Sequence, residues 1–171
     1  MSSPDEVDRI AAAWARELPG VDVSALHVLS RVTRLAHHLD RARRAAFAEH
    51  GLEAGEFDVL AALRRAGAPY EASPGRLGTV TMVTSGTMTA RLDKLENRGL
   101  VQRRTDPQDR RASIVRLASP GRDVVDAAMA SLLVRERGLL AGLSADDQAD
   151  VAQLLRRILE PLDRPTFPSG A

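Results

Sequence analysis

The sequence contains no cysteine among its 171 residues. Disulfide bonds, thiolate metal sites and cysteine-based sensing of oxidants are therefore excluded. Long hydrophobic runs are also missing. No stretch approaches the roughly 18 apolar residues of a membrane span, and residues 1–20 lack the apolar core of a signal peptide. These absences predict a soluble cytoplasmic protein with no membrane partner.

The motifs of common enzyme sites are absent as well. The sequence has no GxxxxGK phosphate loop, no GxSxG nucleophile turn and no HExxH zinc motif. Its four histidines do not stand at zinc-ligand spacing with acidic residues. We therefore expect neither an enzyme nor a metal or cofactor site.

Neither sign of charge is in large excess, because the formal net charge is only +1. That sum does not suggest a nucleic-acid partner. The arginines are nevertheless clustered, and local charge rather than the sum makes a phosphate-binding surface. Apolar residues form 44% of the chain, which is enough for the core of one domain or of two small lobes.

Residues 84–99 carry the clearest helical pattern in the chain. Thr84 is a favourable helix N-cap, and Gly99 supplies a left-handed stop at the other end. Between them, one helical stripe is apolar and predicts a buried face: Met88, Leu92 and Leu95. A short helix over residues 73–80 precedes this one, so the pair has the order of a helix-turn-helix.

A hairpin follows the second helix. Residues 100–104 and 113–117 are predicted strands, and the Asp-Pro-Gln-Asp run at 106–109 fits a β-turn. Arginines surround this loop. A helix-turn-helix followed by an arginine-rich hairpin predicts a winged helix-turn-helix that binds double-stranded DNA.

The second helix presents small and hydroxyl side chains outward. Such a face can lie deep in the major groove, where Ser and Thr bond base edges or phosphates. One of the loop arginines is expected in the minor groove, and Asp109 is expected to brace the loop by pairing with an arginine. The predicted DNA-binding residues are Ser85, Thr87, Thr89, Lys94, Arg104, Arg110 and Arg111. The alternative is that the wing arginines are only a solvated surface.

Helical patterns also flank this motif on both sides. They cover residues 3–18, with Ser3 as the N-cap, residues 24–50, 54–66 and 120–140, and a last helix that begins at Ser144. The predicted fold is mainly α with a small β-hairpin wing. The predicted divisions are N-terminal helices (1–50), a winged helix-turn-helix domain (51–118), C-terminal helices (119–163) and a flexible tail (164–171).

The flanking helices cannot all pack against so small a winged domain. We therefore expect a homodimer in which the terminal helices of two copies interlock about a two-fold axis. The alternative is a monomer with a compact helical lobe.

The run LDKLENRGLVQRRTDPQDRRASIVRLASPGR resembles the signature of MarR-type transcriptional regulators. The resemblance implies a dimeric repressor that binds a pseudo-palindromic operator and is released by a small molecule. Ala90 departs from the pattern, because many members carry a long polar side chain there. Base contacts at that position would be lost, so specificity would depend more on the wing and on DNA shape.

Four further segments resemble the urate-responsive branch of that family, the PecS and TamR type: DEVDRIAAAWAREL, LSRVTRLAHHLDRARRAAFAEHGLEAGEFDVLAALRRAG, SPGRL and VTSGTMTARLDKLE. This resemblance implies four ligand-binding residues: Trp14, Asp58, Arg91 and Arg103. A flat purine anion suits an aromatic ring to stack on, arginines to pair with its charge and an acid to accept its N–H groups.

The resemblance also implies that Asp58 holds Arg103 in the ligand-free protein, with Arg91 as a further partner. Three alternatives remain open: Asp58 forms only a structural salt bridge and Trp14 only fills a core gap; the effector is a phenolic compound or an antibiotic; or the protein is an architectural DNA-binding protein without an effector.

Overall fold

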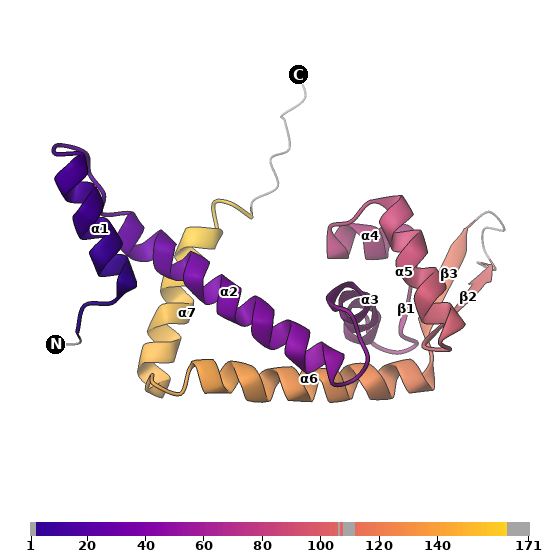
Figure 1. Cartoon of the computed structure of the whole chain (residues 1–171). Coiled ribbons are helices and arrows are strands. Elements are labelled where there is room, and N and C mark those ends of the chain that lie inside the picture. The colour runs from indigo at the N-terminus through magenta and orange to yellow at the C-terminus, as the bar shows by residue number, and fades with distance from the viewer. Residues whose placement is uncertain (1–2, 106, 108–111, 164–171) are drawn as a thin grey trace, which may run out of the picture. The chain divides into compact units, whose positions relative to one another are not determined.

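The computed structural model describes residues 3–105, 107 and 112–163 (Figure 1). These residues form seven helices and one three-stranded antiparallel sheet, so the predicted fold class is confirmed. The chain divides into two compact units, residues 1–132 and 133–171.

The first unit begins with two helices, α1 (Glu6–Glu17) and α2 (Leu26–Ala48). The prediction that Ser3 caps α1 is wrong. Asp5 is the N-cap, and it forms a capping box with Asp8, in which the carboxylate of each accepts the backbone N–H of the other at 3.0 Å. The start of α2 is also later than predicted, because the residues just before it form hydrogen-bonded turns.

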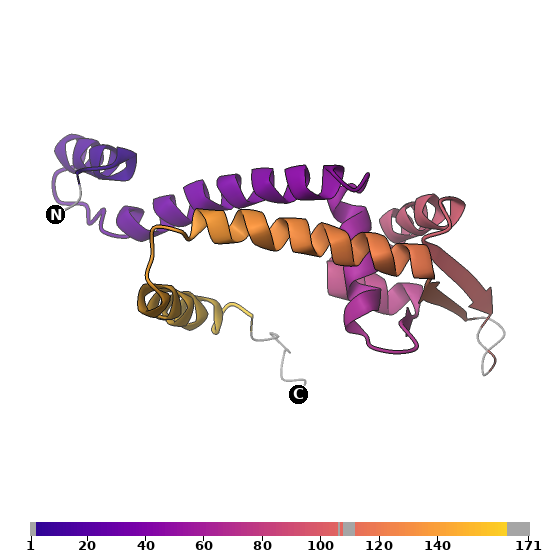
Figure 2. The ribbon, with the colours of Figure 1, turned by 90° about the horizontal axis from the view of Figure 1, so that it is seen from below.

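The winged domain consists of α3 (Ala54–Arg65), α4 (Pro74–Thr81), α5 (Ser85–Asn97) and the strands β1 (Glu71–Ala72), β2 (Val101–Thr105) and β3 (Ser113–Leu117). The strand order is β1-β3-β2. Both predicted strands are confirmed, and Figure 2 shows their hairpin extending away from the helices. The sequence did not predict β1, which exists because Glu71 and Ala72 pair with Arg116 and Val115 of β3.

A single hydrophobic core fixes α5 in this domain. The predicted stripe of α5 is fully buried, with Met88, Leu92 and Leu95 at most 1% exposed. Phe47 of α2 and Phe57 of α3 stack beside it with ring centroids 3.9 Å apart. The polar side of α5 must therefore face outward.

The long helix α6 (Ser119–Leu139) begins directly after β3 and supplies Val125, Ala128 and Leu132 to the same core. Its first turn passes close to the chain before β2, where a Cβ on Gly121 would lie 2.0 Å from the carbonyl oxygen of Leu100. In the second unit, Ser144 caps α7 (Ala145–Leu159) and forms a capping box with Asp147, as predicted.

Candidate functional site

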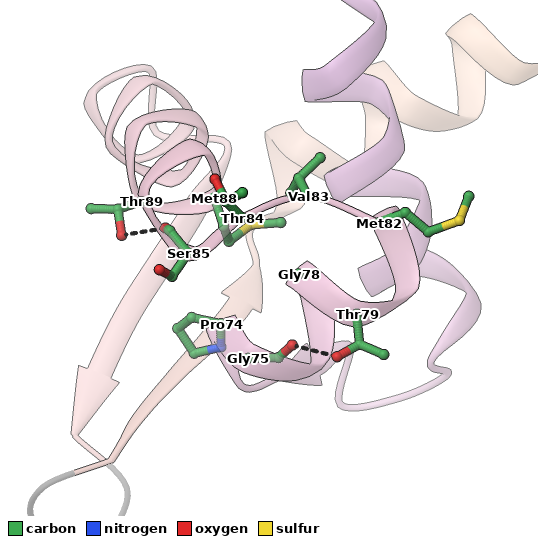
Figure 3. Close-up of a pocket in the computed structure, with 10 residues that line it drawn as sticks. All are labelled: Pro74, Gly75, Gly78, Thr79, Met82, Val83, Thr84, Ser85, Met88 and Thr89. Carbon is green, nitrogen blue, oxygen red and sulfur yellow. Dashed lines mark hydrogen bonds between the residues drawn. The ribbon is translucent and has the colours of Figure 1, made fainter. Parts of the chain in front are cut away.

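The outward face of α5 carries the predicted base-reading residues. Thr84 caps the helix by accepting the backbone N–H of Thr87 at 3.4 Å, so Ser85 and Thr87 lie in the first exposed turn. Thr89 is exposed one turn later, and its hydroxyl donates to the carbonyl oxygen of Ser85 at 3.0 Å (Figure 3). The Thr89 oxygen thus remains available chiefly as an acceptor. The exposed Ala90 leaves the centre of this face flat.

A hollow of about 510 Å³ lies between α4 and α5, next to the hydroxyl residues (Figure 3). The turn between the two helices forms one side of it. Met82 in that turn has a left-handed backbone (φ 53°), and its side chain is 91% exposed. Sequence reasoning missed this feature, because neither the hydropathy nor the type of the residue indicates that a methionine will be in a left-handed conformation.

The predicted phosphate-binding residues that the structure describes are both paired within the chain. The Lys94 ammonium lies 3.4 Å from the carboxylate of Glu53, on the flank of α5 that faces α3. The Arg104 guanidinium reaches across the sheet to Glu71 at 2.9 Å. Both basic side chains remain about half exposed, so a phosphate can still approach them. The wing residues Asp109, Arg110 and Arg111 lie outside the described residues.

The predicted pair between Asp58 and Arg103 is wrong. Asp58 on α3 faces α2 instead, and its carboxylate lies 3.5 Å from the guanidinium of Arg43. Arg103 on β2 faces α5, where its guanidinium pairs with Asp93 and with Glu96. The two predicted partners therefore face different neighbours, since α3 packs on α2 while β2 packs on α5.

Arg91 lies on the side of α5 that faces α3. A Cβ on Gly55 would lie 2.4 Å from its Cζ atom, so the guanidinium rests directly on the first turn of α3. Arg91 is half-buried and has no ion pair among residues 3–105, 107 and 112–163. Gly55 and Asp58 are three residues apart on α3 and share a face, so Arg91 lies within about one helical turn of Asp58.

Trp14 lies at a different place from the other three predicted ligand residues. It is 49% exposed on α1. This helix is held to the first turns of α2 by Arg31, which bonds Asp5 at 2.9 Å and Asp8 at 2.8 Å. Asp58 instead contacts Arg43, twelve residues further along α2 and so about 18 Å away. Within one chain, Trp14 is therefore not brought beside Asp58.

The hydrogen bonds and ion pairs at the start of α1 also lower the pKa values of two aspartates. The backbone N–H of Asp8, and then the Arg31 guanidinium, lower the pKa of Asp5 below its usual value. Arg31 foremost, and then the backbone N–H of Asp5, lower the pKa of Asp8. These groups remain ionised over the neutral range, so they hold α1 to α2 there.

Known proteins resemble this chain in sequence and in fold. A model described as the MarR family matches residues 50–112. The HTH-type transcriptional regulator PecS of Dickeya dadantii (strain 3937) is 34% identical over 153 residues, which are 90% of this chain and 92% of PecS. The chain belongs to the MarR family of transcriptional regulators. Its relatives are transcriptional regulators and not enzymes.

Two solved structures of other proteins resemble this chain. A mutant MarR of E. coli complexed with operator DNA is 26% identical and aligns with a TM-score of 0.62 over 81% of this chain and 99% of that one. Bordetella bronchiseptica BpsR, whose DNA binding is regulated by 6-hydroxynicotinic acid, is 26% identical with a TM-score of 0.59, over 75% and 98% of the two chains.

The described residues contain no group of three or more His, Asp or Glu side chains placed to hold a metal ion. No helix among them is both long enough and apolar enough to cross a membrane.

Proposed function

We propose that two copies of the chain form a repressor that binds a pseudo-palindromic operator, with each α5 in a major groove. The exposed hydroxyl face of α5 carries this proposal, because its buried stripe leaves that face free in a chain of the MarR family. Ser85, Thr87 and Thr89 would bond base edges or phosphates. Phosphate contacts would come from Lys94, Arg104, Arg110 and Arg111.

Exposed apolar faces on the terminal helices support a homodimer. Four large apolar side chains on α2 and four on α7 are each 39–54% exposed: Val28, Leu29, Val32 and Leu35, and Val151, Leu154, Ile158 and Leu159. Exposed patches of this kind mark protein interfaces. Leu29→Glu is expected to give a monomer by light scattering and to lose operator binding. His38→Glu, which adds the same charge at an exposed polar position of α2, is expected to do neither.

Footprinting on a duplex selected from a random-sequence library tests the DNA-binding mode. We expect two symmetric protected half-sites with centres about one helical turn apart. Ala90→Glu, which places a carboxylate at the centre of the outward face of α5, is expected to abolish binding. Protection of one asymmetric half-site would exclude the two-fold arrangement.

We further propose that a small planar anion, such as urate, releases the repressor from DNA. Arg91 supports this, because a half-buried guanidinium without an ion pair among the described residues is a ready partner for an anion. Asp58, about one turn away, would accept N–H groups of the ligand. The residues proposed for this site also include Arg103 and Trp14, and Trp14 joins them only where assembly brings α1 to α3.

Calorimetric titration with urate, phenolic acids and 6-hydroxynicotinic acid tests the effector. We expect urate to bind the protein and to release it from DNA. The Arg91→Ala variant is expected to lose both urate binding and urate-induced release. Trp14→Phe is expected to keep DNA binding and to lose the response. A second candidate is another aromatic acid, which the regulation of BpsR favours. If none of these compounds binds while the operator is still bound, release by urate or another aromatic acid is excluded.

A further inference from the structure

One flank of α5 changes from hydroxyl groups to carboxylates along its length. Ser85, Thr89 and Asp93 are spaced by four residues and Glu96 follows by three, so all four share this flank. The two acids are 55% and 41% exposed. A helix that enters the major groove with this flank would carry two carboxylates toward a polyanion.

Arg103 of β2 pairs with both carboxylates. Its Nη2 contacts Asp93, and its Nε lies 3.2 Å from an oxygen of Glu96. Its backbone N–H donates to the other Glu96 oxygen at 3.0 Å. The side chain is only 26% exposed, and its Nε is fully shielded from solvent without a well-directed hydrogen bond. These contacts hold the Arg103 guanidinium against α5, so it is poorly placed to reach a phosphate.

No other basic side chain among the described residues forms an ion pair with either acid. The neighbouring cations have other partners, since Lys94 pairs with Glu53 and Arg104 with Glu71. Repulsion between like charges at an interface is costly, and DNA carries one negative charge on every phosphate. Among the described residues, Arg103 is thus the one cation that pairs with these two acids.

We propose that Arg103 is a positioning residue for DNA binding: it compensates the charge of Asp93 and Glu96 and ties the wing strand to α5. This assigns it a role that needs neither a DNA contact nor an effector. The inference rests on the proposed placement of α5 in the major groove.

The test measures operator affinity over a series of salt concentrations for combined variants. Arg103→Gln removes the charge but keeps a side chain that can bond Glu96, and it is expected to weaken binding about tenfold or more. Adding Asp93→Asn and Glu96→Gln is expected to restore affinity to within about threefold of the wild type, because the charges that Arg103 compensated are then gone. The two acid substitutions alone are expected not to weaken binding.

Arg116→Ala is the matched control, since it removes one exposed wing arginine whose nearest acid is Glu71 at 3.8 Å. Its effect should not respond to the two acid substitutions. Thermal unfolding by circular dichroism confirms that each variant is folded.

Two results would overturn the inference. Arg103→Gln could bind like the wild type, or it could stay weak after both acid substitutions while its salt slope falls by about one unit, which is the signature of a lost phosphate contact. The Ala90→Glu variant distinguishes these two results from a failure of the proposed placement of α5 in the major groove. If Ala90→Glu also binds DNA normally, α5 is not in the groove at all.

Discussion

Replacing Gly55 with alanine should separate the position of Arg91 from the stability of the fold. The new Cβ would lie 2.4 Å from Cζ of Arg91 and 2.6 Å from its Nε, which is too close for either atom to remain. The clash is with the far end of a flexible side chain and not with backbone. We therefore expect α3 and α5 to stay in place while the guanidinium leaves the first turn of α3.

The expected change in stability is small and favourable. Alanine is preferred over glycine within a helix by about 1 kcal/mol, and by less in the first turn, where Gly55 stands. A gain of about 0.5 kcal/mol would raise the melting temperature by roughly 1–2 °C for a chain of this size. Gly75 is the matched control, because it is also the second residue of its helix and a Cβ there meets nothing within 4 Å.

Gly121→Ala should lower the stability of the fold, in contrast to Gly55→Ala. Its Cβ would lie 2.0 Å from the carbonyl oxygen of Leu100, which is a backbone atom already held by a 3.0 Å hydrogen bond from the N–H of Ala118. Neither α6 nor the chain before β2 can move without disturbing the core. Overpacking of this kind costs about 1–3 kcal/mol, so this variant should be clearly destabilised.

Denaturant unfolding at one fixed protomer concentration measures all three variants, since the stability of a dimer depends on concentration. Effector-induced release from DNA is then measured for Gly55→Ala and Gly75→Ala. Only Gly55→Ala should lose the response. The reasoning fails if Gly55→Ala is as unstable as Gly121→Ala, or if the Gly55 and Gly75 variants respond to the effector equally.

Three other perturbations have expected outcomes. Truncating Arg110 or Arg111 to alanine should weaken operator binding and lower the salt slope by about one unit, as measured by fluorescence anisotropy. Arg98→Ala leaves the 4% exposed Glu56 without its 3.0 Å ion pair, so denaturant unfolding should show a loss of about 1–3 kcal/mol, whereas Arg98→Lys should lose less. The pKa values of Asp5 and Asp8 are lowered in the folded protein. Their ion pairs therefore stabilise the packing of α1 at pH values above the ordinary aspartate pKa, and this stabilisation is lost as the pH falls through the lowered pKa values. The fluorescence of Trp14 should therefore stay constant near neutrality and change only in strong acid.

Local rules predicted the elements of the winged domain well. The stripe beginning at Met88 is buried as expected, Gly99 ends α5 with a φ of 68°, and β3 spans the predicted residues 113–117. Each of these depends on neighbours within a few positions in sequence. The strand β1 could not be predicted in this way, because a two-residue strand is defined only by its pairing with a distant partner.

The candidate site was less predictable for the same reason. The sequence identifies which residues are charged, but the choice of ion-pair partner depends on tertiary packing. Asp58 pairs with Arg43 because α3 packs on α2, and Arg103 pairs with two acids of α5 because β2 packs there. The contact of Arg91 with Gly55 also has no local signal, since it requires α5 to cross the first turn of α3.

Arg91 and Asp93 lie on nearly opposite sides of α5. Two residues correspond to about 200° of helical rotation, so the α3 flank and the wing flank are about 160° apart. An anion at Arg91 can therefore act on the angle between α5 and α3 while Arg103 still compensates the wing-side acids. Such an anion releases DNA only if it binds the DNA-free form more tightly, and by linkage the operator must then weaken anion binding by the same factor. Titrating the effector with and without saturating operator measures this factor. It should equal the loss of operator affinity at saturating effector, and it should fall to one in Gly55→Ala.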